Sequence, residues 1–136
     1  MKKSLFVLSL LFVMMFVLSA CAGGGASTTI DVIFAEFTFT PAEFTVPAGQ
    51  EITLNATNNG AVVHEFVIMK FGTTVGENFG DEDLANIYWK VEVEPGASVT
   101  ATFTAPAEPG EYQVVCGTAG HYMAGMIAKL IVVDGG

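Results

Sequence analysis

From residue 30 onward the chain consists of short runs of apolar and β-branched residues that are separated by turn signals. The runs at residues 52–57 and 98–104 alternate between apolar and polar side chains, which is the pattern of a strand with one buried face. Turn-forming sequences, NNG at 58–60 and PG at 95–96, separate such runs. This regular succession of short strands and turns predicts an all-β fold, either a sandwich or a barrel.

Residues 71–90 depart from the strand pattern. They contain three glycines and the acidic cluster 81–83, which is followed by a short apolar stretch. An Asp81 N-cap with acidic residues in the first turn favours a short helix, so we expect a long crossover that lies against the sandwich. The remaining strands are expected at residues 30–34, 43–46, 62–69, 90–94, 111–116 and 126–133.

The N-terminal residues are typical of an exported protein. Lys2 and Lys3 precede an apolar run at residues 5–18, which is too short to span a bilayer comfortably and predicts a signal peptide at residues 1–20. The sequence LSAC that ends at Cys21 resembles a bacterial lipobox, in which this cysteine carries the lipid; the alternative is an ordinary secretory signal. Residues 21–29 would then be a lipidated flexible tether, and residues 30–136 the folded domain.

The chain is acidic. Its 5 Lys and 14 acidic residues, with no Arg, give a net charge of −9, and loss of Lys2 and Lys3 with the signal peptide would make it −11. Nucleic-acid binding requires cationic contacts to phosphate, so that class of partner is excluded. If Cys21 is lipidated, Cys116 has no partner for an intramolecular disulfide.

One eleven-residue segment, CGTAGHYMAGM, places Cys116, His121 and Met126 at intervals of five residues. The other histidine, His64, stands far upstream at the start of an apolar strand. Taken singly, a buried cysteine or a core methionine is commonly structural. Together these residues supply thiolate, imidazole and thioether donors, a soft set that suits copper, whereas methionine is a poor zinc ligand. The joint pattern therefore predicts a metal site.

The pattern Cys-x4-His-x4-Met, preceded by a histidine in the segment VVHEFVI, resembles the cupredoxins, and its loop spacing is most similar to the auracyanin and rusticyanin-type members. The segments FTVPAGQEITL and PGEYQVVC are also similar to family segments, and the resemblance extends from residue 30 to 133. It implies a Greek-key β-sandwich that holds one mononuclear type 1 copper ion, alternating between Cu(I) and Cu(II). The ligands that it implies are His64, Cys116, His121 and Met126.

Two residues near these ligands differ from the simplest form of the pattern. Glu65 occupies a position that is Asn in many members, where the side chain steadies the cysteine loop, so that support for the sulfur is not expected here. Met123 is a second thioether close to the site, and the spacing favours Met126 over it. The loop histidine of the family passes electrons through its exposed edge, which by position is His121.

The neighbours of His121 in the loop carry no charge, so we expect them to form a docking patch for redox partners. This patch consists of Ala119, Gly120, Tyr122 and Met123. A loop kept tight by glycine would explain the Gly residues equally well.

The resemblance implies a monomeric electron carrier, not an enzyme. Its expected partners are redox proteins such as a cytochrome, a photosynthetic complex or a terminal oxidase, and its expected location is the extracytoplasmic side of a membrane, as a periplasmic or cell-surface lipoprotein. One alternative is a copper carrier or sensor that delivers the metal itself. Another is a structural or adhesion lipoprotein without metal. The chain has two histidines, too few for a multicopper oxidase.

Overall fold

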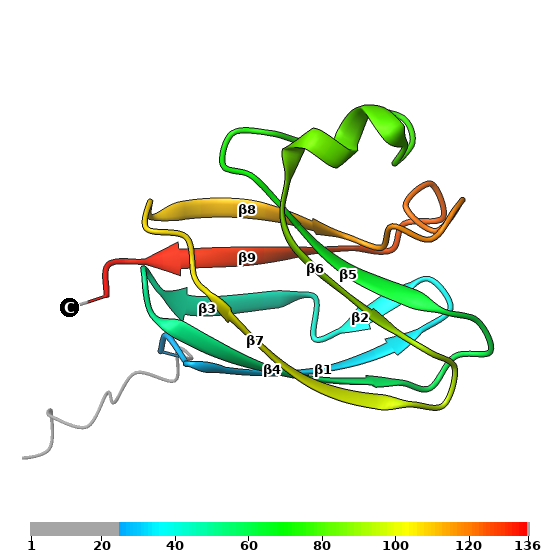
Figure 1. The fold of residues 1–136 in the computed structure, drawn as a ribbon, viewed down its shortest axis with the longest axis horizontal. Coiled ribbons are helices and arrows are strands. Elements are labelled where there is room, and N and C mark those ends of the chain that lie inside the picture. Colours follow the sequence, from blue (N-terminus) through cyan, green and yellow to red (C-terminus); the bar gives the residue numbers. More distant parts are fainter. Residues whose placement is uncertain (1–24, 136) are drawn as a thin grey trace, which may run out of the picture.

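The computed structural model describes residues 25–135, which fold within that range into two β-sheets packed face to face (Figure 1). The predicted signal peptide and Cys21 lie outside the described residues. Along this part of the chain the strands are β1 (Thr29–Ala35), β2 (Thr38–Thr40), β3 (Glu43–Pro47), β4 (Glu51–Asn58), β5 (His64–Met69), β6 (Ile87–Val93), β7 (Ser98–Thr104), β8 (Gly110–Val115) and β9 (Ile127–Val133). A single 3-10 helix, η1 (Asp81–Asn86), precedes β6 in the described range.

The order of the strands confirms the predicted β-sandwich. In residues 25–135 one sheet has the order β2-β1-β4-β7 and the other the order β3-β9-β8-β5-β6. Both sheets are mixed, because β1 runs parallel to β4 and β3 runs parallel to β9, while the other pairs are antiparallel. The two parallel pairs join strands that are not neighbours in the sequence, so each sheet depends on pairing between distant parts of the chain.

Alternation along the strands builds the core between the sheets. In β4, Ile52, Leu54 and Ala56 are buried while the residues between them are partly exposed. Aromatic side chains fill the space at the centre, where the ring of Phe34 stacks on that of Phe66 with centroids 6.2 Å apart. Burial of each such side chain contributes roughly 1.5–3 kcal/mol to the stability of the fold. The core therefore holds the strand ends, and with them the loops that connect the strands, in place.

The crossover differs from the sequence expectation in its details. The helix is a 3-10 helix capped by Gly80, not by Asp81, and the carboxylate of Asp83 accepts the Gly80 N–H at 3.0 Å. A carboxylate at the third helical position satisfies a free donor of the first turn, which explains why the cap lies one residue earlier. The strand that follows begins at Ile87, so part of the predicted crossover is strand β6. The short strand β2 was not predicted.

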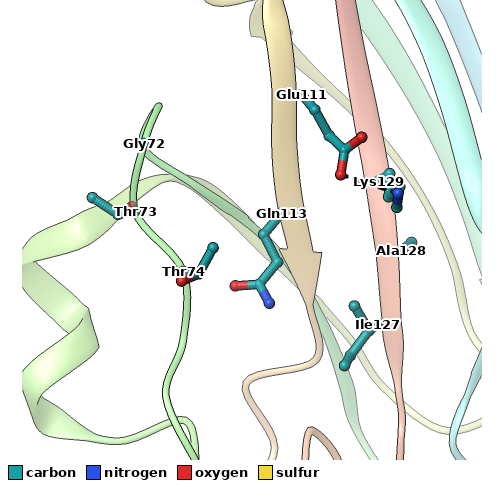
Figure 2. Close-up of a pocket in the computed structure, with 8 residues that line it drawn as sticks. All are labelled: Gly72, Thr73, Thr74, Glu111, Gln113, Ile127, Ala128 and Lys129. Atoms are coloured by element: carbon teal, nitrogen blue, oxygen red, sulfur yellow. Dashed lines mark ion pairs between the residues drawn. The ribbon is translucent and has the colours of Figure 1, made fainter.

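The crossover covers the outer face of the five-stranded sheet. Val75 packs there with Val67, Met69 and Val115, and its N–H donates to Oε1 of Gln113 at 2.8 Å. Figure 2 shows the shallow groove that remains between residues 72–74 and strands β8 and β9, with a volume of about 310 Å³. In residues 25–135 no helix has the length and apolar character needed to cross a bilayer.

Candidate metal centre

Strand pairing brings the cysteine and the upstream histidine together. Strands β5 and β8 are antiparallel, and Val67 lies opposite Val115. The end of β8 therefore lies beside the start of β5, which places Cys116, directly after β8, next to His64, the first residue of β5. In Figure 1 the loop at residues 116–126, in orange, lies at this end of the sandwich.

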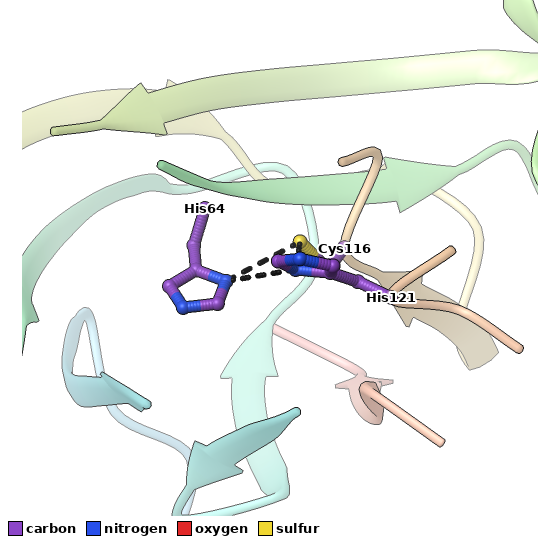
Figure 3. Close-up of side chains that lie close together, drawn as sticks. All are labelled: His64, Cys116 and His121. Carbon is purple, nitrogen blue, oxygen red and sulfur yellow. Dashed lines mark hydrogen bonds between the residues drawn. The ribbon is translucent and has the colours of Figure 1, made fainter. Parts of the chain in front are cut away.

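Three donor atoms converge at this point (Figure 3). The Nδ1 atoms of His64 and His121 are 3.1 Å apart, and Sγ of Cys116 lies 3.7 Å from Nδ1 of His64 and 3.5 Å from that of His121. A metal bonded at about 2.0–2.1 Å to nitrogen and 2.3 Å to sulfur keeps such donors roughly 3.5–3.8 Å apart in a trigonal plane. The two distances to sulfur lie in this range, and the distance between the two nitrogens is about 0.4 Å shorter. A small separation of the imidazoles would therefore let the three donors hold a metal ion.

The burial of the three donor residues favours metal binding. His64, Cys116 and His121 are all buried, and Cys116 is a free cysteine within the described residues. Burial lowers the pKa of His64, and the neighbouring His121 lowers it further. An imidazole must be neutral to bind a metal, so the environment favours the form of His64 that acts as a ligand.

The ligand loop is held by its own backbone hydrogen bonds. The Cys116 N–H donates to the carbonyl of Met126 at 3.1 Å, and the Met126 N–H donates to that of His121 at 3.0 Å. The hydroxyl of Thr118 donates to the carbonyl of Val63 at 3.0 Å, which ties the loop to the residue before His64. These bonds close a tight turn in which three of the four predicted ligands lie at set positions.

The two methionines of the loop lie in different environments. Met126 is fully buried among the core residues beside Cys116, whereas Met123 is 68% exposed. The three other predicted ligands are also buried, so Met126 shares their environment and would be the methionine that supplies the thioether.

Glu65 supports the sulfur through its backbone. Its N–H lies 3.5 Å from Sγ of Cys116, while its carboxylate pairs with Lys90 at 2.6 Å. The structure thus shows a donor to the sulfur that does not depend on the side chain at this position. The carboxylate lies against Gly117, where an added Cβ would overlap it.

The residues of the predicted docking patch differ in their exposure. Ala119, Gly120 and Met123 are exposed around His121, whose own exposure is 7%. Tyr122 is partly buried, and its hydroxyl donates to the carbonyl of Val75 at 3.1 Å, so this side chain is turned toward the crossover.

Two residues that the sequence analysis did not single out also contact the histidines. Phe37 lies in the β1–β2 turn with a φ of 67°, and its ring meets that of His121 edge to face with centroids 5.1 Å apart. Glu36, beside it, has Oε1 at 3.8 Å from Nε2 of His64. The Ala61 N–H, which donates to Glu36, lowers the pKa of that carboxyl. A phenylalanine is not a typical turn residue, so the sequence carried no local signal for this turn.

Comparison with known proteins agrees with this geometry. The family model of the Cupredoxin-like domain matches residues 8–132. Auracyanin-A of Chloroflexus aurantiacus is 33% identical, with 93% of this chain and 94% of that protein covered. The crystal structure of dithionite-reduced auracyanin from Roseiflexus castenholzii is 36% identical, covers 81% of this chain and all of its own, and superposes with a TM-score of 0.68.

A third relative is named for copper resistance. The copper-resistant cuproprotein CopI of Rubrivivax gelatinosus is 28% identical over 79% of this chain and 67% of its own length. The solved structure of auracyanin A from Chloroflexus aurantiacus, 32% identical with a TM-score of 0.63 over 80% of this chain and all of its own, is described as that of a blue copper protein. The donor set found here suits a copper ion. The chain therefore belongs to the cupredoxin family, with one copper ion as its cofactor.

Proposed function

We propose that this protein is a type 1 blue copper protein that transfers single electrons between redox partners outside the cytoplasm. The observation that carries the proposal is the buried convergence of His64, Cys116 and His121. Met126, which is buried in the same loop, would supply the thioether ligand. Copper bound there supplies a one-electron couple between Cu(I) and Cu(II). The chain's own part is to hold three donors in one arrangement that serves both oxidation states.

The rigidity of the donors favours electron transfer over metal delivery. The three donor residues are buried, two of them follow or begin core strands, and the loop between them is tied by backbone bonds. A carrier that hands over its metal needs an exchangeable site, and of the soft donors in the described loop only Met123 is exposed. The exposed residues around His121 are the proposed contact surface for a redox protein.

Loading with Cu(II) tests the metal centre. The purified protein is expected to become intensely blue through charge transfer from the Cys116 thiolate, and Cys116→Ser is expected to lose that absorption band. Persistence of the blue band in Cys116→Ser would show that another residue supplies the sulfur. The matched control is Met123→Leu, which changes an exposed sulfur of the same loop and is expected to keep the band.

The second candidate function, copper carriage, is favoured by the similarity to CopI. Two rates separate it from electron transfer: electron self-exchange, followed by NMR line broadening, and the loss of copper to a chelator. Fast self-exchange with slow copper loss supports the electron carrier. Slow self-exchange with rapid copper loss would establish the carrier of metal instead.

We further propose that a lipid on Cys21 tethers the domain to the extracytoplasmic face of a membrane. The supporting observation is the sequence LSAC after a short apolar run, followed by a Gly-rich segment. Cys21→Ala is expected to move the protein from the membrane fraction to the soluble fraction of expressing cells. Unchanged membrane association in Cys21→Ala would remove the lipid anchor from the proposal.

A further inference from the structure

The outer nitrogen of His64 is a buried polar atom that lacks a partner. Nδ1 of His64 faces the other donors, so Nε2 faces away from them (Figure 3). Nε2 is fully buried and has no hydrogen-bond partner within residues 25–135. When Nδ1 of a neutral imidazole binds a metal, Nε2 carries the proton and becomes a donor. A buried donor of this kind requires an acceptor, because an unpaired one has lost its hydrogen bond to water without gaining another.

A carboxylate from the β1–β2 turn lies beside this nitrogen. Oε1 of Glu36 is 3.8 Å from Nε2 of His64, so a movement of about 0.8 Å would bring the pair to an ordinary hydrogen-bond length near 3.0 Å. The same oxygen already accepts the Ala61 N–H at 2.5 Å. Glu36 therefore joins the turn to the segment that leads into His64, and its carboxylate is held close to the imidazole.

Gly60 provides the space that this approach needs. A Cβ at residue 60 would lie 2.5 Å from Oε1 of Glu36 and 2.8 Å from Nε2 of His64, closer than real contacts allow. A side chain here would therefore separate the carboxylate from the imidazole. Because residue 60 is a glycine, the carboxylate of Glu36 and the imidazole of His64 can lie close to each other.

The same turn holds the second histidine through Phe37. A bulky residue at a φ of 67° is strained, and a glycine at this position would avoid that strain. The ring that is placed in this way packs edge to face on His121. The two residues of this turn thus contact both imidazoles: the carboxylate of Glu36 lies near His64, and the ring of Phe37 packs on His121.

We propose that Glu36 is a positioning residue of the copper centre, whose carboxylate accepts the Nε2 proton of His64. This inference rests on the proposed role of His64 as a copper ligand. A negative acceptor makes the imidazole a stronger electron donor and favours Cu(II) over Cu(I). The side chain of Glu36 is 41% exposed, so it keeps its charge while one oxygen faces the histidine. Glu36 thereby lowers the reduction potential of the centre.

Neutralising the carboxylate tests this role. In Glu36→Gln the equilibrium with a redox mediator is expected to move toward Cu(I) by at least threefold, which equals about 30 mV at 59 mV per tenfold change. Glu94→Gln is the matched control, because Glu94 is exposed and follows Val93, the residue that pairs with His64. An equal shift in Glu36→Gln and Glu94→Gln would overturn the proposal, since it would reflect only the lost charge.

Hydrogen exchange gives a second, independent measurement. In the diamagnetic Cu(I) protein the Nε2 proton of His64 is expected to exchange slowly, and Glu36→Ala is expected to accelerate that exchange at least tenfold. Equal exchange in Glu36→Ala and the wild type would show that Glu36 does not accept this proton. If the wild type itself fails to turn blue with Cu(II), the ligand assignment is wrong. If the wild type turns blue but Glu36→Gln leaves the potential unchanged, or Glu36→Ala leaves the proton exchange unchanged, only the role of Glu36 is rejected.

Discussion

At the scale of single residues, Gly117 shows how closely the chain packs around the sulfur. It follows Cys116 directly, and a Cβ there would overlap the Glu65 carboxylate and lie 3.2 Å from the ring of Phe79. The carboxylate has little freedom to withdraw, because it is 13% exposed and bonded to Lys90 at 2.6 Å. The lack of a side chain at residue 117 therefore allows the Glu65–Lys90 pair to lie against the residue that follows the cysteine.

We expect Gly117→Ala to lower the free energy of unfolding by about 1–2 kcal/mol, because the added methyl must displace the Glu65 carboxylate. Urea unfolding of the copper-free protein measures this change. Gly76→Ala is the control, since a Cβ at residue 76 meets nothing within 4 Å. Adding Glu65→Ala should recover most of the loss through non-additivity. Equal stability of Gly117→Ala and Gly76→Ala would contradict the steric explanation.

At the scale of elements, the ligand loop and the crossover support each other through Tyr122. Its hydroxyl bonds to the carbonyl of Val75, and its ring packs against the cluster that contains Val67 and Val115. Val115 immediately precedes Cys116, so the crossover contacts both the ligand loop and the end of the strand that leads into it. The crossover between β5 and β6 thereby helps to hold the ligand loop in place.

Tyr122→Phe is expected to lower the free energy of unfolding by about 1 kcal/mol and to accelerate copper loss several-fold, because the loop loses its bond to the crossover. Unfolding by urea and copper transfer to a chelator measure the two effects. Tyr88→Phe is the matched control, since it removes a similar bond of 2.8 Å to the carbonyl of Thr104. If both variants lose copper at the same rate, the bond to Val75 does not hold the loop.

At the scale of the whole molecule, the donors lie at one end of a sandwich whose core consists of apolar side chains from both sheets. The packing between the sheets is continuous from Phe34 and Phe66 to Val114 and Leu130. His64 and Cys116 adjoin strands β5 and β8, which are held by main-chain pairing on both sides. We therefore expect folding alone to bring the donors close to one another.

Removal of copper is therefore expected to leave the β-sandwich intact, with an unchanged far-ultraviolet circular dichroism spectrum. Copper should raise the unfolding temperature, because free metal at 100 times its dissociation constant adds about 2.7 kcal/mol to the stability of a folded state that alone binds it. Thermal scans of the two forms measure the difference. A copper-free chain without strand signal would show that the metal is needed for folding.

The sequence by itself determined the strands and the ligand loop, because both depend on short-range order. Alternating side chains select one buried face, and a loop of nine residues between Cys116 and Met126 brings its donors near each other whatever the rest of the chain does. The fold class followed from the local patterns, and the family and its copper from the resemblance of the ligand motif, with His64, to the cupredoxins. The structure and the comparisons confirmed them.

Only the tertiary structure decided which distant groups surround the metal. The approach of His64 to Cys116 depends on the pairing of β5 with β8, and the contacts of Glu36 and Phe37 with the histidines depend on how the two sheets are stacked. No local pattern encodes such distances, since they result from the packing of the whole core. The sequence thus specified the donors, and long-range packing specified the groups that hold and tune them.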